Sequence, residues 1–148
     1  MGILFARATK VSKKPYFDID KYSQEVSLDV SKYPDLNKQL QLLKLTNDDL
    51  AIIKQLEPFA PEIIPTMVEQ FYAAISLSTE LTDIINNTSK IDRLKVTLYK
   101  HLESIFKASI DSHYLEERQT IAHVHVRIGL KSKWYIASFQ SLITTFIE

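Results

Sequence analysis

Apolar residues recur at helical spacing along most of this chain, and this pattern predicts an all-α domain. Between Thr66 and Glu148 there is no proline and only one glycine, so little except helix caps can interrupt a helix there. No internal repeat or low-complexity segment is present. The predicted helices run over about 35–43, 46–56, 62–77, 79–85, 89–110, 111–128 and 132–148.

Polar residues at the ends of these segments predict where the helices begin and end. Thr46, Ser89 and Asp111 can each accept a hydrogen bond from a backbone N–H of the first turn, so we expect all three to begin helices. Gly129 can end a helix in the left-handed conformation. Pro65 is expected near the first turn of its helix, where a missing N–H is tolerated.

The first residues of the chain, 1–34, are polar and lack a clear period. We expect them to form an extended, partly mobile arm, followed by a single globular domain at 35–148. The last predicted helix, from Ser132, is apolar on nearly all sides. A helix of this kind is usually buried on more than one face.

Composition then excludes several classes of function. Eighteen basic residues balance 18 acidic residues, which does not fit a dedicated nucleic-acid-binding protein. The absence of cysteine excludes disulfides and thiolate metal sites. Two isolated glycines cannot form a phosphate-binding loop or a dinucleotide-binding fingerprint. No apolar stretch approaches the roughly 18 residues of a membrane helix, so we expect no membrane insertion and a cytoplasmic protein.

His125 is the first candidate for chemistry. In a helix its neighbours three and four residues away are Ile121, Ala122, Ile128 and Gly129, so its imidazole lies on an apolar face close to a helix end. A neutral imidazole in such a place can bind a metal through one ring nitrogen. A packed core histidine with one hydrogen bond explains the same pattern, and helical spacing alone does not distinguish the two.

A competing interpretation treats residues 123–128 as a β-strand. His123 and His125 would then point the same way and could hold Zn²⁺, with a third ligand from His101, His113 or a carboxylate. Helical patterns on both sides make this less favoured. On a helix, positions 123 and 125 diverge by about 200° and cannot share a metal, which leaves His123 on the solvent side.

Tyr72 is the second candidate. It shares a helix face with Val68 and Ile75, and a buried phenol needs a hydrogen-bond partner or a ligand for its hydroxyl. A tyrosine in this setting is also a common core residue.

Two ordered segments carry a family resemblance: Ile121-Ala-His-Val-His-Val-Arg-Ile-Gly-Leu130, and Lys133-Trp-Tyr135 shortly after it. Further landmarks are Gln-Leu-Glu-Pro at 55–58, Val-Glu-Gln-Phe-Tyr at 68–72, Asp-Ile-Ile-Asn at 83–86 and Asp-Arg-Leu-Lys at 92–95. From about Leu42 to its end, the chain resembles the heme-binding globin domain of the globin-coupled sensors, most closely the bacterial heme-based aerotactic transducers.

This resemblance implies a globin fold of the sensor type, apparently without its final helix, because family domains continue through another long helix. It implies heme b as cofactor, with His125 as the proximal iron ligand. Tyr72 and Thr97 correspond to distal hydroxyl donors, Leu94 to an apolar distal position, and Tyr135 to the aromatic residue near the proximal histidine. The other expected pocket residues are Val68, Leu98, Ile121 and Ile128.

The implied function is reversible binding of O₂, with CO and NO as further candidate ligands, and the passing of a signal in chemotaxis or aerotaxis to an output domain outside this chain. The resemblance also implies a homodimer formed through the C-terminal helix, and no enzymatic activity. Three alternatives stand beside it: a heme-free globin-like stress sensor, which should lack a proximal histidine; a zinc-binding protein that uses His123 and His125; and a purely structural helical module.

Overall fold

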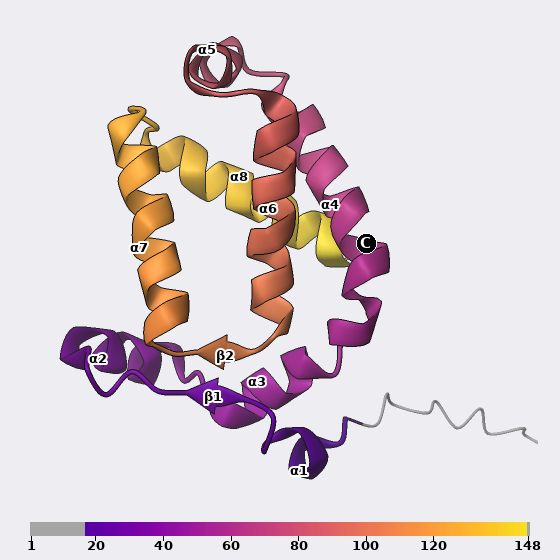
Figure 1. Cartoon of the computed structure of the whole chain (residues 1–148), viewed down its shortest axis with the longest axis vertical. Coiled ribbons are helices and arrows are strands. Elements are labelled where there is room, and N and C mark those ends of the chain that lie inside the picture. The colour runs from indigo at the N-terminus through magenta and orange to yellow at the C-terminus, as the bar shows by residue number, and fades with distance from the viewer. Residues whose placement is uncertain (1–16, 148) are drawn as a thin grey trace, which may run out of the picture.

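The computed structural model describes residues 17–147 of the chain. Within this range the prediction of an all-α domain is confirmed, with one very small sheet of two-residue strands (Figure 1). The elements are α1 (Ile19–Tyr22), β1 (Ser27–Leu28), α2 (Pro34–Leu43), α3 (Asn47–Lys54), the 3₁₀ helix η1 (Glu57–Phe59), α4 (Ala60–Ile75), α5 (Thr79–Thr88), α6 (Ile91–Phe106), β2 (Ser109–Ile110), α7 (Ser112–Arg127) and α8 (Ser132–Ile147). No helix in the described range combines the length and apolar character needed to cross a membrane.

Most helix ends agree with the expected caps. Thr46 begins α3 with a full capping box, because its side chain accepts from the Asp49 N–H while the Asp49 carboxylate accepts from the Thr46 N–H. Asp111 caps α7 by accepting from the backbone N–H of Tyr114. The prediction for Ser89 is wrong: the N-cap of α6 is Lys90, and Ser89 instead ends α5.

The beginning of α4 also differs from the prediction. The helix starts at Ala60, directly after the 3₁₀ turn that contains Pro58, and Pro61 occupies its first turn. Pro65 therefore lies inside α4 rather than near its start. Because proline has no N–H to donate, α4 lacks one backbone hydrogen bond there.

The end of α6 is the larger correction. The helix ends at Phe106 rather than near residue 110, and Ala108 adopts a left-handed conformation with φ of 54°. Residues 109–110 then form β2, which pairs in parallel with β1 in the register Ser27 to Ser109. A strand pairing between distant segments cannot be inferred from local spacing.

This pairing revises the expectation of a separate arm for residues 17–33. Besides β1, this segment contains α1, which packs against α3, and the Asp18 N–H donates to Oε1 of Gln55 at 2.8 Å. The segment is therefore folded onto the domain. The rest of the expected arm, residues 1–16, lies outside the described residues.

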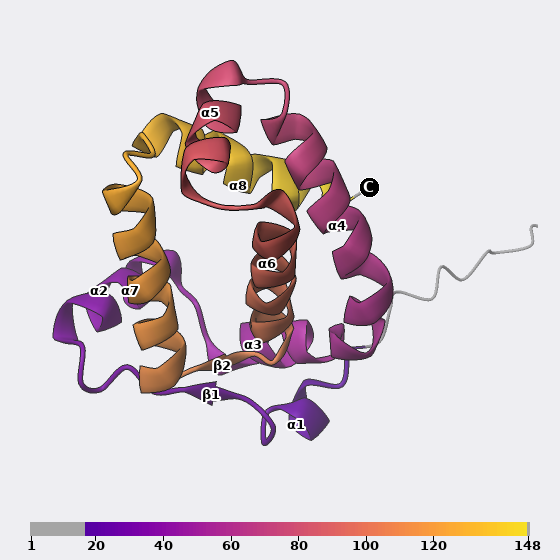
Figure 2. The same ribbon diagram turned by 45° about the horizontal axis from the view of Figure 1, so that its top comes forward.

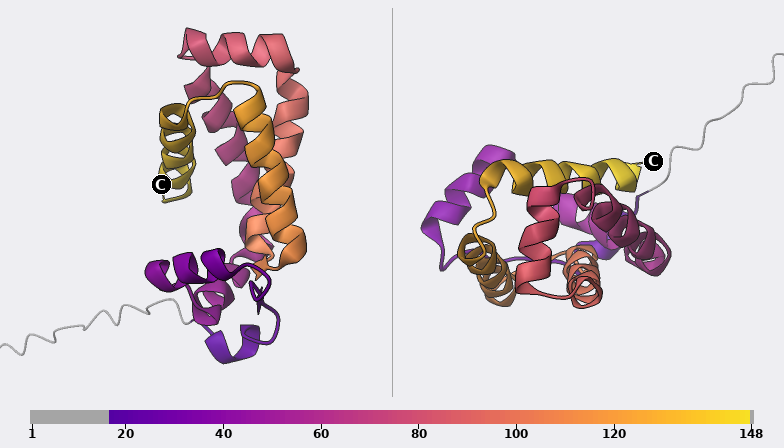
Figure 3. Two further views of the ribbon diagram at one scale, coloured as in Figure 1. Left: turned by 90° about the vertical axis from the view of Figure 1, so that its left-hand side faces the viewer. Right: turned by 90° about the horizontal axis from the view of Figure 1, so that it is seen from above.

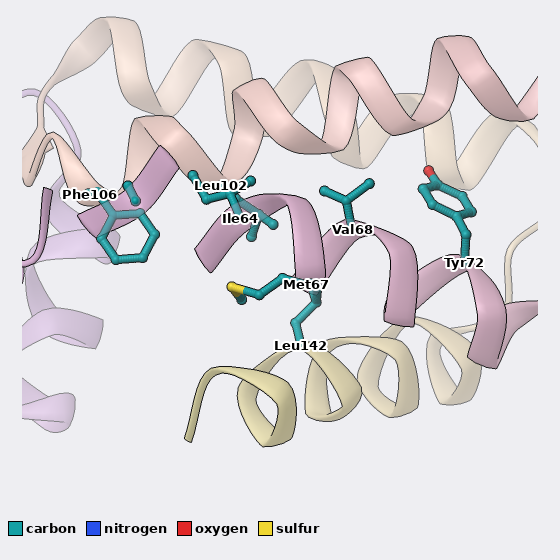
Figure 4. Packing of buried hydrophobic residues seen from close by; sticks show 8 residues of the cluster. Ile64, Met67, Val68, Tyr72, Leu102, Phe106 and Leu142 are labelled. Carbon is teal, nitrogen blue, oxygen red and sulfur yellow. The ribbon is translucent and has the colours of Figure 1, made fainter. Parts of the chain in front are cut away.

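The core is built around α4, whose inward side is buried between α6 and α8 (Figure 4). Ile64 is fully buried, and Tyr72 is only 7% exposed. Phe106 of α6 and Phe146 of α8 meet with ring centroids 5.9 Å apart. The other buried members of this cluster are Ala60, Met67, Val68, Leu102 and Leu142.

Helix α7 is placed differently from the helices of this core. It runs beside α6, with β2 joining the two helices at one end and α8 crossing behind them (Figures 1 and 2). None of its residues, all of which are described, is buried, and β2 directly precedes its first turn. Seen from above, α7 stands apart from the group formed by α4, α6 and α8 (Figure 3, right). The side chains of α7 are therefore at most partly buried.

Candidate functional site

His125 lies in the last turn of α7, as the helical interpretation predicts, and the strand interpretation of residues 123–128 is wrong. The helix ends in a glycine motif: Gly129 has φ of 74°, its N–H donates to the Val126 carbonyl, and the Leu130 N–H donates to the His125 carbonyl at 3.0 Å. The backbone of His125 is thereby fixed in the final turn.

The imidazole of His125 is half-buried and lies against the ring of Tyr135 at the start of α8. The ring centroids are 5.4 Å apart, and the rings meet edge to face at 68°. Burial lowers the pKa of His125, and the nearby Ile121 carbonyl acts in the opposite direction. The imidazole is therefore neutral at neutral pH, which is the form that binds a metal.

The ring nitrogens of His125 have no strong partner in the described structure. The buried Nδ1 atom lies near the Ile121 carbonyl one turn earlier but makes no well-aligned hydrogen bond. A proton on Nδ1 would face that carbonyl and would leave the lone pair on Nε2. Ile121 and Ile128, both expected to lie in a pocket, are partly buried beside it.

Tyr72 lies on α4, within the core, and its side chain points toward α6 (Figure 4). Its ring packs edge-on against Phe71, with centroids 5.1 Å apart. Burial raises the pKa of Tyr72 to about 12, and neither a charge nor a hydrogen-bond partner among the described residues contributes to this shift. The phenol is therefore protonated at neutral pH, and its hydroxyl has no hydrogen-bond acceptor among residues 17–147.

Three other expected pocket residues belong to the same core region as Tyr72. Val68, one turn earlier on α4, is buried in the same cluster, and Leu94 and Leu98 of α6 pack against that cluster. Thr97 differs, because it is exposed and its hydroxyl donates to the Arg93 carbonyl of its own helix at 3.0 Å. To donate to a ligand instead, the Thr97 hydroxyl would have to leave this bond.

The structure thus divides the expected site residues into two groups. One, on α7 and α8, contains His125 and Tyr135, and the other, on α4 and α6, contains Tyr72 with its apolar neighbours. The hydrogen bonds and ring contacts described above join residues within a group, and none joins one group to the other. The imidazole and the phenol thus lie on separate elements, and the helix that carries the imidazole has no buried residue.

Two further polar residues lie beside α7: His101, expected from the sequence only as a candidate third zinc ligand, and Arg118, for which the sequence predicts no role. His101 of α6 has a buried Nδ1 atom without a hydrogen-bond partner among the described residues. Its pKa is lowered to about 4, first by burial and then by the charges of Arg118 and His125. Arg118 precedes His125 by about two helical turns, so the two residues share a face of α7. This spacing is the feature of the sequence that places Arg118 on the same side of the helix as His125.

An ion pair links α5 to the corner that follows α7. Lys131 Nζ lies 2.8 Å from the Glu80 carboxylate. The hydrogen bond from Lys131, followed by one from Trp134, lowers the pKa of Glu80. The Trp134 Nε1 atom is buried and lacks a well-aligned partner within the described range. This ion pair connects α5, at the top of Figure 1, to the segment just after His125.

The zinc interpretation has no support in this geometry. His123 is exposed on the helix, as expected, and points away from His125. Among residues 17–147 no three histidine, aspartate or glutamate side chains are close enough to hold a metal ion together.

The family model of the protoglobins matches residues 32–148, which is most of the chain. The chain belongs to the protoglobin family. The resemblance to globin-coupled sensor heme domains and the expected globin fold are confirmed at this level. Membership of this protoglobin family implies a heme cofactor and binding of small gas ligands. The match begins at residue 32, two residues before α2.

The residues of this protoglobin fit a heme. The half-buried, neutral imidazole of His125 suits ferrous iron, and its Nδ1 atom, short of a full hydrogen bond, faces a backbone carbonyl that can orient it. Tyr135 and Phe139 of α8 are 48% and 46% exposed, which leaves aromatic surface that a porphyrin can cover.

Proposed function

We propose that this protoglobin senses O₂ by reversible binding to heme b, with His125 as the proximal ligand. The proposal rests chiefly on one observation: a neutral, half-buried imidazole held in the last turn of α7 beside Tyr135. When bound, the heme would supply a ferrous iron that can take up a diatomic gas. CO and NO are further ligands of this chemistry.

His125 would hold the heme through Nε2, while its Nδ1–H is directed to the Ile121 carbonyl. The edge of Tyr135 limits rotation of the imidazole, because the two rings are in contact. Ile121 and Ile128 add apolar contacts on the same face. These residues together would hold the imidazole in one orientation, with the lone pair of Nε2 free for iron.

Tyr72 would act on the other side as the hydrogen-bond donor to the gas. A raised pKa keeps its hydroxyl protonated, and no described residue competes for the proton. A polarised O₂ ligand accepts this bond more strongly than CO does, so the phenol favours O₂. A hydrogen bond to a charged acceptor changes affinity by about ten- to a hundredfold. Val68, Leu94 and Leu98 keep the surroundings of the donor apolar.

Signalling would pass through α8, because this helix carries Tyr135 against the proximal histidine and also presents an exposed apolar face. A ligand shifts a conformational equilibrium only if it binds the two states with different affinity. We propose that α8 is the element that differs between these states, that it pairs with α8 of a second copy, and that it acts on an output domain or partner. The protein is then a cytoplasmic binding module without catalytic activity.

The absorption spectrum of the purified protein, supplied with hemin, tests this proposal. A Soret band should appear at one heme per chain, shift on reduction, and shift again reversibly with O₂ and with CO. A protein that stays colourless with hemin would favour the heme-free stress-sensor class instead. A heme protein that binds CO but oxidises at once in air would contradict reversible O₂ sensing.

A further inference from the structure

Helix α7 carries the proposed iron ligand but has no buried residue, so core packing does not fix its position. Its first turn is fixed by the Asp111 cap and by packing on β2. His125 lies at the opposite end of the helix, so a tilt about that fixed end would move the imidazole most. The polar contacts of α7 with α6 lie between that fixed end and His125, where they can limit such a tilt.

Arg118 provides these contacts. Its Nη2 atom donates to Ser104 Oγ at 2.7 Å and to the His101 carbonyl at 3.4 Å, both on α6. The guanidinium carbon lies 3.9 Å from the centre of the Tyr114 ring, one turn earlier on α7. The side chain is only 20% exposed, so these contacts are largely shielded from water. Glu117 lies 3.8 Å away and partly balances the charge.

The two acceptors lie near the end of α6, where the helix leads into β2. Ser104 in turn donates to the His101 carbonyl at 2.7 Å, so the two acceptors are themselves connected. The positive charge of Arg118 also contributes to the low pKa of His101. Arg118 thus holds a connected polar cluster on α6 while stacking on its own helix.

We propose that Arg118 is a positioning residue that fixes α7 against α6 and thereby sets the position of the His125 imidazole. This inference rests on the proposed function, in which His125 binds iron. A planar guanidinium suits the task, because it can donate to two oxygen atoms and stack on an aromatic ring at the same time. Lysine at this position would keep the charge but lose the fork and the stacking.

The Fe–His stretching band of the reduced, heme-loaded protein tests the inference, because that band reports how the imidazole is held. We expect Arg118→Met to shift or broaden the band and to speed heme loss to excess apomyoglobin by about tenfold or more. Arg118→Lys should restore the rate of heme loss only in part. Arg127→Met is the matched control: it removes an exposed arginine from the same helix and should leave both readouts unchanged.

Amide hydrogen exchange of the heme-free protein gives a second readout. Arg118→Met should speed exchange in residues 119–127 while exchange in α4 stays as in the wild type. If Arg118→Met does not fold, Ser104→Ala removes one acceptor and should shift the same band in the same direction by a smaller amount.

The possible failures are distinct. If the wild-type protein does not bind heme through a histidine, the proposed function is wrong. The hydrogen-exchange measurement on the heme-free protein still tests whether Arg118 holds α7 in place. The positioning role is overturned by a different result: the wild type has a normal Fe–His band, and Arg118→Met shows the same band, the same rate of heme loss and the same hydrogen exchange.

Discussion

The single residue on which heme binding should depend is His125. We expect His125→Ala to abolish stable heme binding, because the iron loses its protein ligand, while most of the helix content remains, because the side chain is only half-buried. The heme-to-protein ratio after gel filtration measures the first effect, and circular dichroism measures the second. His123→Ala, on the exposed side of α7, is the control and should bind heme normally. A full complement of tightly held heme in His125→Ala would disprove the proximal assignment.

Removal of the Tyr72 hydroxyl should change the dissociation rate of O₂ much more than that of CO. Tyr72→Phe keeps the ring and its contact with Phe71 but removes the donor, so O₂ should dissociate about ten- to a hundredfold faster while CO dissociation changes little. Stopped-flow measurement of both off-rates checks this.

Thr97→Val should have a smaller effect than Tyr72→Phe, since the Thr97 hydroxyl is engaged with the Arg93 carbonyl. Equal O₂ off-rates in the wild type, in Tyr72→Phe and in the double variant with Thr97→Val would rule out a distal hydroxyl donor.

The candidates that the sequence offers are residues whose setting follows from neighbours within one helix. His125 and Tyr72 stand out because residues one turn away on the same helix are apolar, and the family resemblance then supplies their expected roles. The contacts of Arg118 could not be predicted, because its acceptors His101 and Ser104 lie on another helix, across the turn that contains β2. The environment of Trp134 depends likewise on Glu80, which is distant in the sequence.

At the scale of elements, local chemistry predicted most helix starts but not every helix end. Thr46 and Asp111 cap their helices through bonds within one turn, and such bonds can be recognised from spacing alone. The end of α6 depends instead on the left-handed Ala108 and on the pairing of β2 with β1, which lies far earlier in the chain. The apolar pattern continues past Phe106, so it suggested a longer helix than the structure contains.

Two of the helix ends that carry a left-handed residue, those of α7 and α2, should respond oppositely to substitution. Gly129 has φ of 74°, and a Cβ added there would meet open space, so Gly129→Ala should cost about 1 kcal/mol of unfolding free energy through backbone strain alone. Lys44, which ends α2 with φ of 54°, is exposed, and Lys44→Gly should raise the free energy of unfolding by up to about 1 kcal/mol.

Urea denaturation of the wild type, Gly129→Ala and Lys44→Gly measures both changes in the free energy of unfolding. Lys38→Gly in the middle of α2 is the control, because glycine there should lower the free energy of unfolding by about 1 kcal/mol. A loss of stability in Lys44→Gly as large as in Lys38→Gly would contradict this explanation of the helix ends.

At the scale of the whole molecule, α8 presents two apolar faces to different surroundings. Leu142 is buried against α4, and Phe146 meets Phe106 of α6, so one face belongs to the core. The other face carries Ile136, Ile143 and Ile147, which are 68%, 39% and 76% exposed. In a helix these three isoleucines lie on one side, and such a continuous apolar surface favours association.

We predict that this second face of α8 pairs with the same face of another copy, because a two-fold contact places identical apolar surfaces against each other. Sedimentation of the heme-bound protein at several concentrations should show a reversible dimer. Ile136→Glu and Ile143→Glu should each shift it toward monomer, because a charge buried in the contact loses its hydration. Ala137→Glu, exposed on another side of α8, adds the same charge and should leave the dimer intact.

If α8 also transmits the state of the site, dimer formation should differ between the O₂-bound and reduced forms of the wild type, since Tyr135 on this helix contacts His125. A protein that remains monomeric at every concentration in both forms, with all three variants alike, would remove α8 as the interface.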